Sequence, residues 1–295
     1  MDIAGTYPML YAFFDASGAL VREAVTRQVN AALAVGASGI ACLGLGTEVA
    51  KLSLAERRQI IDWVIADVRG RAPVAVTIAD GNVPDMIESA RYAERAGASW
   101  LILQPPRPPA SGADLIRFFA SIAQSVSLPC GIQNAPEFLG IGLTSAELLS
   151  LHAEAPNVTL VKAEASAVAV ARTIEAVKGR MRVFNGRAGL ELTDNYRAGV
   201  DGMIPGMETI DLQVAIEKAM RAGEDEVAEG LYRRLLPTVT FIMQGLPQLL
   251  TYGKLIAALR LGITPSAARL PAEPLSALGE QWALRLAREL GPLPG

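Results

Sequence analysis

Histidine and cysteine are scarce in this chain of 295 residues, which has one histidine and two cysteines. Cys42 and Cys130 sit in apolar runs without CxxC spacing, so we expect buried, reduced thiols. His152 stands alone, and no His/Cys/Asp cluster has metal-ligand spacing, which argues against a transition-metal site. Since a second histidine and a GxSxG motif are also missing, serine hydrolase chemistry is poorly supported.

Long hydrophobic runs and a strong charge of one sign are also missing. Charges or glycines interrupt every apolar segment before about 18 residues, and residues 1–8 lack the form of a signal peptide, so no membrane span is expected. The formal net charge is −3, and the densest basic group is Arg233-Arg234, which argues against a nucleic-acid partner. We therefore predict a cytoplasmic protein.

The sequence does contain a repeated alternation of short apolar runs and longer amphipathic stretches. The runs are apolar or β-branched, as expected for strands buried on both faces. Between them, a capping box at Ser53–Glu56 and glycines after Ala96, Ala198 and Ala222 mark helix ends. The expected strands are Tyr7–Phe13, Gly39–Leu43, Val74–Ile78, Trp100–Leu103, Cys130–Gln133, Thr159–Lys162, Arg182–Asn185 and Gly202–Ile204.

Eight strands that alternate with helices predict a (β/α)8 TIM barrel over residues 1–210. A C-terminal helical extension follows over residues 211–295, and we expect it to pack on the barrel as one structural unit. Its helices are expected at 212–222, 224–243, 248–261 and 275–290. An open doubly wound sheet is the alternative, but no GxGxxG follows the first expected strand.

Lys162 is the strongest candidate for catalysis. It alone among five lysines ends an apolar strand run, whereas the others fall on expected helices or turns. A lysine that faces into a barrel is desolvated, which lowers its pKa and frees a neutral amine to form an imine with a ketone. The alternative is a strand-end lysine that reaches solvent or pairs with a carboxylate, and the pattern alone does not decide between them.

Glu164 lies two residues beyond Lys162, and side chains of a strand repeat every two residues. If the extended conformation persists, the carboxylate and the amine therefore share one face. Such a carboxylate can carry protons during imine formation or at the neighbouring substrate carbon. A simple ion pair between the two side chains is the alternative.

Other polar or glycine-rich segments follow expected strands, at the end of a barrel where active sites lie. Glycines allow close backbone approach, so amides and a hydroxyl in such a turn can hold a small anion such as a carboxylate. Side-chain amides can donate hydrogen bonds to a substrate hydroxyl or simply satisfy the loop backbone. The segments are Gly44–Glu48, Gln133-Asn134 and Asn185-Gly186-Arg187.

Short motifs spread over nearly the whole chain fit one known family. They are Gly5-Thr6-Tyr7-Pro8, Gly44 to Glu48, Leu52-Ser53 with Glu56-Arg57, Gln133-Asn134-Ala135-Pro136, Val161-Lys162 with Glu164-Ala165-Ser166, Gly202-Met203-Ile204 and Ala268-Arg269-Leu270-Pro271. Together they resemble the dihydrodipicolinate synthase / N-acetylneuraminate lyase family of lysine-dependent class I aldolases.

The resemblance implies a (β/α)8 barrel with a helical extension, an imine between Lys162 and pyruvate or a related 2-keto acid, and no separate cofactor or metal. It also implies a homotetramer built from two tight dimers. With the candidates above, we predict catalysis by Lys162, Glu164 and Gln133. Substrate binding is predicted at Gly46, Thr47, Asn134, Gly186 and Ile204.

The chain also departs from the resembled family at functional positions. Gln133 stands where synthase and lyase members have a tyrosine that relays protons, which argues against dihydrodipicolinate synthesis itself. The other departures are Leu45-Gly46 in place of paired threonines, Phe138 in place of an arginine for the distal carboxylate, and Pro106-Arg107 in place of a tyrosine pair. Arg107 either binds a polar end of the substrate or is a surface residue.

Two motifs resemble one branch of the family, L-2-keto-3-deoxyarabonate dehydratase: Ile132 to Pro136, and Lys162-Ala163-Glu164. An iminium at C2 acidifies the C3 hydrogens, so Glu164 can take a C3 proton and assist departure of the C4 hydroxyl, which Gln133 orients. We therefore expect dehydration of a 2-keto-3-deoxy sugar acid. The alternatives are a retro-aldol lyase that releases pyruvate, a dihydrodipicolinate synthase, and a non-catalytic 2-keto-acid-binding sensor.

Overall fold

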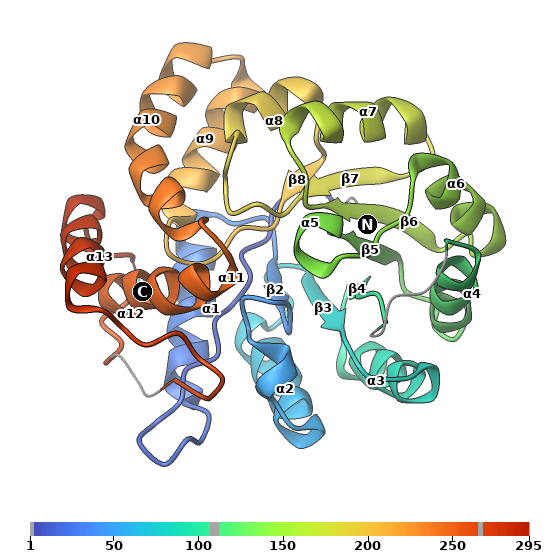
Figure 1. Ribbon diagram of the computed structural model, residues 1–295, viewed down its shortest axis with the longest axis horizontal. Helices are drawn as coiled ribbons and strands as arrows, with labels where there is room; N and C mark the ends of the chain where they lie inside the picture. Colours follow the sequence, from blue (N-terminus) through green and yellow to red (C-terminus); the bar gives the residue numbers. More distant parts are fainter. Residues whose placement is uncertain (1–2, 107–111, 265–267, 295) are drawn as a thin grey trace.

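Eight parallel strands form the centre of the computed structural model, which describes residues 3–106, 112–264 and 268–294. Arg107 lies outside the described residues. Helices surround the strands (Figure 1), which confirms the predicted (β/α)8 barrel with C-terminal helices. The strands are β1 (Gly5–Thr6), β2 (Ile40–Cys42), β3 (Val74–Ile78), β4 (Trp100–Leu103), β5 (Cys130–Asn134), β6 (Val158–Ala163), β7 (Arg182–Asn185) and β8 (Gly202–Met203).

The first strand differs from its prediction, whereas the other seven lie within one residue of theirs. The sequence predicts a strand at Tyr7–Phe13, but regular pairing covers only Gly5–Thr6. Pro8 lacks an N–H and cannot donate toward β2, and beyond it the pairing is reduced to single bridges at Met9. The apolar character of the segment that follows comes from burial in the core, not from strand pairing.

Met9 closes the barrel between β2 and the segment that follows β1. It forms single parallel bridges with both Ala41 and Gly206. The Met9 amide donates to the Pro205 carbonyl at 2.7 Å, and the Leu10 amide donates to the Ala41 carbonyl at 2.9 Å. Because the chain bonds to β2 on one side and to the end of β8 on the other, the carboxyl ends of all strands face one common region.

The barrel interior is filled by side chains. Tyr7 follows β1, Trp100 lies on β4 and Phe184 lies on β7, and their ring centroids lie 5.5 to 5.9 Å apart. Leu160 joins the same buried cluster and lies two residues before Lys162 on β6, so both side chains point inward. A pocket can therefore form only above this packed layer.

The helices around the barrel begin and end at the predicted signals. Ser53 and Thr144 each form a capping box, and Gly97, Gly199 and Gly223 end helices in the left-handed conformation. The helices are α1 (Arg22–Val35), α2 (Leu54–Val68), α3 (Val83–Ala96), α4 (Gly112–Ala123), α5 (Pro136–Leu139), α6 (Ser145–Glu154), α7 (Ala167–Val177), α8 (Leu192–Ala198) and α9 (Ile210–Ala222), with a short 3-10 turn η1 (Val49–Lys51).

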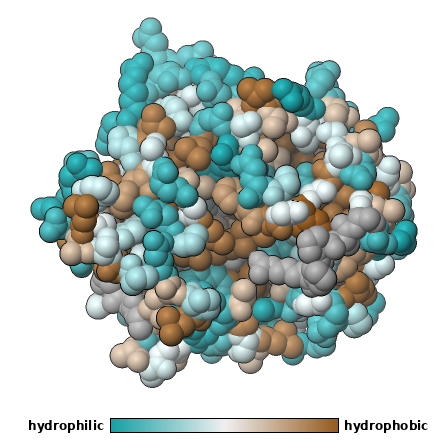
Figure 2. All heavy atoms as spheres, in the orientation of Figure 1, coloured by the Kyte–Doolittle hydropathy of each residue, from teal (hydrophilic) through white to brown (hydrophobic). Residues whose placement is uncertain are grey.

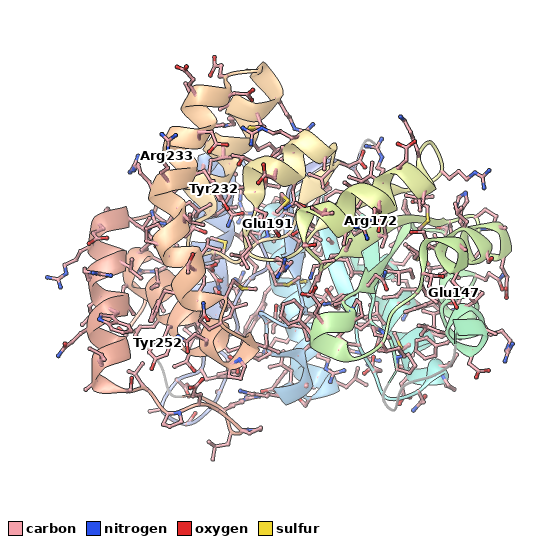
Figure 3. The ribbon with its side chains drawn as sticks, turned by 45° about the horizontal axis from the view of Figure 1, so that its top comes forward. Glu147, Arg172, Glu191, Tyr232, Arg233 and Tyr252 are labelled. Atoms are coloured by element: carbon pink, nitrogen blue, oxygen red, sulfur yellow. The ribbon has the colours of Figure 1, made fainter. Side chains whose placement is uncertain are left out.

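The C-terminal helices lie together beside the barrel (Figure 1). They are α10 (Asp225–Ile242), α11 (Leu246–Gln248), the π-helical turn η2 (Leu249–Gly253), α12 (Lys254–Arg260) and α13 (Ala277–Leu290). Tyr232 on α10 accepts a hydrogen bond from the Glu191 amide at 2.9 Å, which joins α10 to the start of α8 (Figure 3). Among the helices of the described ranges, none combines the length and the apolar character that crossing a membrane requires.

Arg260 fixes α12 to the barrel. Its guanidinium makes two hydrogen bonds to Asp211 on α9, at 2.9 and 2.7 Å, and donates to the carbonyls of Glu208 and Gly291 at 2.7 and 2.6 Å. The Arg260 side chain is fully buried. A buried guanidinium is stable only when its donors are satisfied, so this residue holds three segments in one geometry.

We expect Arg260→Met to lower the free energy of unfolding by about 3 kcal/mol, because the substitution leaves buried carbonyls and a carboxylate without their donor. Urea denaturation followed by circular dichroism measures this change. Arg285→Met is the control, because Arg285 is exposed and pairs loosely with Glu289, and a change below about 0.5 kcal/mol is expected there. Equal losses in both variants would contradict the proposed role of Arg260.

Candidate active site

The ends of β5 and β6 bring the predicted catalytic side chains together. Gln133 and Lys162 are partners in the parallel register. The Glu164 amide donates to the Asn134 carbonyl at 2.9 Å, so the extended conformation continues one residue past β6. This continuation is the condition under which Lys162 and Glu164 share one face.

One carboxylate oxygen of Glu164 contacts both Lys162 and Gln133. Glu164 Oε1 lies 2.7 Å from Lys162 Nζ and 2.7 Å from Gln133 Nε2. Lys162 is 7% exposed and Glu164 4% exposed, so the two charges are almost removed from water. Mutual attraction and the amide donor offset that desolvation, and a carboxylate this close to an amine can exchange a proton with it.

Gly186 has no side chain, and this leaves room for Lys162 and Glu164. A Cβ atom at Gly186 would lie 2.5 Å from Lys162 Cε, 3.1 Å from Glu164 Cγ and 3.2 Å from Glu164 Oε1. A larger residue after β7 would therefore push the lysine and the glutamate away from their present positions. The glycine predicted for substrate binding shapes the catalytic pair directly.

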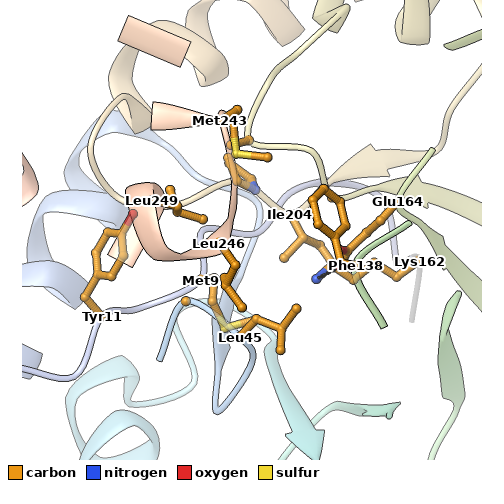
Figure 4. Close-up of a pocket in the computed structure, with 15 residues that line it drawn as sticks. Met9, Tyr11, Leu45, Phe138, Lys162, Glu164, Ile204, Met243, Leu246 and Leu249 are labelled. Atoms are coloured by element: carbon orange, nitrogen blue, oxygen red, sulfur yellow. Dashed lines mark ion pairs between the residues drawn. The ribbon is translucent and has the colours of Figure 1, made fainter. Parts of the chain in front are cut away.

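A pocket opens beside Lys162 and Glu164 at the carboxyl ends of the strands (Figure 4). Gly46, Gly186 and Ile204, three of the predicted substrate-binding residues, line it. The remaining lining residues are Met9, Tyr11, Leu45, Phe138, Ala188, Pro205, Gly206, Met243, Leu246 and Leu249. The structure thus brings Lys162, Glu164, Gly46, Gly186 and Ile204 around one space.

The side chains of Thr47 and Asn134 are engaged away from the pocket. The Thr47 hydroxyl donates to the Leu10 carbonyl at 2.6 Å. The Asn134 amide exchanges two hydrogen bonds with the Leu143 backbone, at 2.9 and 2.8 Å. Neither residue belongs to the pocket lining, so their predicted contact with substrate stays a prediction.

Gln133 lies behind Glu164 rather than in the pocket lining. Its Nε2 holds Glu164, while its Oε1 is buried and has no hydrogen-bond partner among the described residues. An unpaired buried acceptor is costly, and a substrate hydroxyl is one group that can satisfy it. Gln133 is therefore placed to position the carboxylate.

The glycine-rich turn after β2 packs against the segment that closes the barrel. A Cβ at Gly44 would lie 2.5 Å from Met9 Cε, and the Gly44 amide lies 3.2 Å from Met9 Sδ. Glu48 ends the turn with a left-handed backbone, φ 58°. Its carboxylate binds Lys254 and Lys51 at 2.7 and 2.6 Å, away from the pocket.

Tyr11 is the one tyrosine in the described pocket lining. Its hydroxyl donates to Glu208 Oε2 at 2.7 Å. Burial and the neighbouring Glu208 carboxylate raise the pKa of Tyr11 well above its usual value, and burial also raises the pKa of Glu208. Tyr11 therefore stays protonated and is engaged with a protein partner.

The sequence alone does not single out Met243, Leu246 or Leu249 of the pocket lining, and it marks Phe138 only as a departure from the resembled family. Phe138 lies on the short helix α5, and Met243, Leu246 and Leu249 lie where α10 ends and η2 begins. Because these residues come from far along the chain, only the tertiary fold brings them to β6. The break at Gly245 between the expected C-terminal helices was the one local signal.

The remaining sequence predictions concern residues outside this pocket. His152 lies on α6, where Nδ1 is 2.8 Å from the Val158 carbonyl. Cys42 and Cys130 are free and buried, and burial raises the pKa of each thiol to about 12. Within the described part of the chain, no group of three or more His, Cys, Asp or Glu side chains could hold a metal ion.

Comparisons with known proteins agree with this geometry. The family model described as "Dihydrodipicolinate synthetase family" matches residues 2–287. The chain belongs to this family. It is therefore an enzyme of the class I aldolase superfamily, a group of lyases that use a Schiff-base lysine.

Two relatives from Escherichia coli K12 illustrate the range of names in the family. YagE, provisionally named a 2-dehydro-3-deoxy-D-gluconate aldolase, is 31% identical over 238 residues, 79% of each chain. YjhH, provisionally named a 2-dehydro-3-deoxy-D-pentonate aldolase, is 26% identical over 239 residues, also 79% of each chain. The crystal structure of YagE in complex with pyruvate is similar to this chain, with a TM-score of 0.91, 28% identity and 98% coverage of both chains.

We expect Gly186→Ala to reduce imine formation at Lys162 at least tenfold while the fold is kept. The added methyl group displaces the far end of the lysine side chain, which can move without a backbone shift, and misplaced reacting groups lose large factors in rate. Borohydride trapping with pyruvate measures the adduct, and thermal unfolding checks the fold. Gly230→Ala is the control, because a Cβ there meets nothing within 4 Å.

Proposed function

We propose that this chain is a Schiff-base lyase that removes water from a 2-keto-3-deoxy sugar acid or a closely related 4-hydroxy-2-keto acid. The observation that carries the proposal is the buried contact between Lys162 Nζ and Glu164 Oε1 at 2.7 Å, beside a pocket. An amine that can lose its proton to a neighbouring carboxylate is equipped to attack a ketone.

The proposed reaction begins with imine formation at C2. The Lys162 amine adds to the keto carbon, and one water leaves to give an iminium. Glu164 then takes a proton from C3, and the electrons of that C–H bond move toward the iminium nitrogen. The C4 hydroxyl departs with a proton returned by Glu164, and hydrolysis of the unsaturated iminium frees Lys162 and the dehydrated product.

Gln133 acts in this scheme as a positioning residue. Its amide donates to the Glu164 oxygen that also contacts Lys162, at 2.7 Å. This hydrogen bond fixes the orientation of the carboxylate. Glu164 is thereby held facing the lysine, next to the position of the substrate carbon in the proposed imine.

Retro-aldol cleavage is the second candidate, and the names of YagE and YjhH favour it. It requires a base at the C4 hydroxyl, whereas the hydroxyl of the pocket tyrosine, Tyr11, donates a hydrogen bond to Glu208 and has a raised pKa. Loss of water requires no such base, because Glu164 supplies both proton transfers. These observations favour C–O cleavage over C–C cleavage and support the dehydratase branch resemblance.

Borohydride reduction in the presence of pyruvate should leave a covalent adduct that intact mass detects. We expect Lys162→Ala to lose the adduct, because the imine nitrogen is then missing. Lys254→Met is the matched control, because Lys254 is also buried against a glutamate, at 2.7 Å from Glu48, but lies outside the pocket lining. An adduct that survives Lys162→Ala, or no adduct in the wild type, would rule out the Schiff base.

Glu164→Gln should lower turnover at least 100-fold, because the amide cannot accept the C3 proton. The pyruvate adduct should still form, only more slowly. Incubation of the wild type with 2-keto-3-deoxy sugar acids should give a dehydrated semialdehyde, and release of pyruvate plus an aldehyde would instead establish the retro-aldol reaction. Full activity in Glu164→Gln would remove Glu164 from the mechanism.

Several expectations from the sequence analysis stay predictions for this chain. They are the homotetramer built from two tight dimers, the cytoplasmic location, and the division at residue 210 into barrel and extension. None of them enters the proposed reaction.

A further inference from the structure

The pocket beside Lys162 has an apolar wall facing the catalytic pair. Beyond Lys162, Glu164 and Tyr11, every described side chain of the lining is apolar or absent. The larger apolar side chains come from the turn after β2, from α5, from the residue after β8, and from the chain between the end of α10 and the start of η2. They are Leu45, Phe138, Ile204, Met243, Leu246 and Leu249.

These side chains surround the lysine in space. In Figure 4, Phe138 and Ile204 lie near Lys162 and Glu164, and Leu45 and Leu246 lie across from them. Figure 2 shows apolar atoms around the hollow in the middle of the face between α5 and α11. The part of a bound substrate that extends away from the imine therefore meets carbon atoms.

Most polar side chains near the pocket are already engaged. The Tyr11 hydroxyl donates to Glu208, the Thr47 hydroxyl donates to the Leu10 carbonyl, and the Asn134 amide binds the Leu143 backbone. The acceptors that lack a partner, Gln133 Oε1 and Glu208 Oε1, belong to residues outside the lining. Beyond the C4 hydroxyl, which Glu164 serves in the proposed reaction, a further substrate hydroxyl therefore loses its hydrogen bonds to water and meets apolar side chains of the described lining. Such a loss disfavours binding of a polyol chain.

Charge leads to the same conclusion. Among the described lining residues, Lys162 is the one cation, and its amine is committed to Glu164 and to the keto carbon. A carboxylate at the far end of a substrate would lie against Phe138 and the leucines without a partner. Burial of an unpaired charge is more costly still than burial of a hydroxyl.

We propose that the substrate of this enzyme carries an apolar group on C4, an alkyl chain or a ring, in place of a polyol or a second carboxylate. The inference rests on the proposed function, because it assumes an imine at Lys162, and it narrows the proposed substrates to 4-hydroxy-2-keto acids that lack the further hydroxyls of a sugar acid. It applies equally whether the C4–O bond or the C3–C4 bond is cleaved. The specificity-determining residues are those of the apolar wall, with Leu246 at its centre.

Two substrates that differ by one oxygen test the proposal. In 4-hydroxy-2-oxopentanoate the group on C4 is a methyl, and in 4,5-dihydroxy-2-oxopentanoate it is a hydroxymethyl. We expect kcat/KM for total substrate consumption to be about 10-fold to 100-fold higher for the methyl compound, the range over which an apolar pocket discriminates against an added hydroxyl. 4-Hydroxy-2-oxohexanoate should also be preferred over 2-keto-3-deoxygluconate.

Matched variants connect that preference to the wall. Leu246→Gln offers a polar partner in the pocket and should bring the ratio of the two kcat/KM values close to one. Leu250→Gln is the control, because Leu250 is also a half-buried leucine of the same segment but lines a different cavity. In that variant the ratio should stay at its wild-type value.

The ratio of kcat/KM for the methyl compound to kcat/KM for the hydroxymethyl compound, measured in the wild type, tests the proposal even if a variant does not fold. A preference for the hydroxymethyl compound, in an enzyme that forms the pyruvate adduct, would overturn the apolar-group inference and leave the Schiff base standing. Absence of the adduct would overturn the proposed function, and this inference with it. A ratio that falls equally in Leu246→Gln and Leu250→Gln would contradict the assignment to the wall.

Discussion

Closure of the barrel at Met9 is the constraint on which the active site depends. The Met9 amide binds the Pro205 carbonyl, and the adjacent Leu10 amide binds the Ala41 carbonyl, so two edges of the sheet become one ring. The Met9 side chain then packs under the Gly44 amide and reaches the pocket. One short segment thus joins the strands and forms part of the substrate site, which explains why glycine follows β2.

Inside that ring, the charged side chains of Lys162 and Glu164 occupy the space that the packed core leaves free. The aromatic layer of Tyr7, Trp100 and Phe184 fills the barrel below Lys162. Gly186 leaves the space above the layer in which the lysine and Glu164 meet. A buried lysine is tolerated because its partner carboxylate lies at hydrogen-bond distance, and the same proximity gives the pair its chemistry. Stability and reactivity therefore depend on one contact.

The C-terminal helices complete the site from outside the barrel. Arg260 fixes α12 against α9 through Asp211, and the chain before α12 carries Leu246 and Leu249 over the strand ends. The barrel alone supplies the proposed catalytic groups, whereas the chain from the end of α10 to η2 supplies much of the apolar wall. Differences in this wall can change the substrate without any change to the lysine and the glutamate.

Seven of the eight strands, the helix caps and the common face of Lys162 and Glu164 could be predicted from the sequence alone. These features depend on local periodicity and on a two-residue spacing within one strand. The sequence placed the first strand wrongly, because pairing around Pro8 depends on bonds to β2 and β8 that only a closed barrel makes. Only the tertiary structure decided that the side chains of Thr47 and Asn134 bind backbone groups. It also decided that Phe138, Leu246 and Leu249 lie around the same pocket as Lys162. Such contacts join residues far apart in the chain, and no local pattern encodes them.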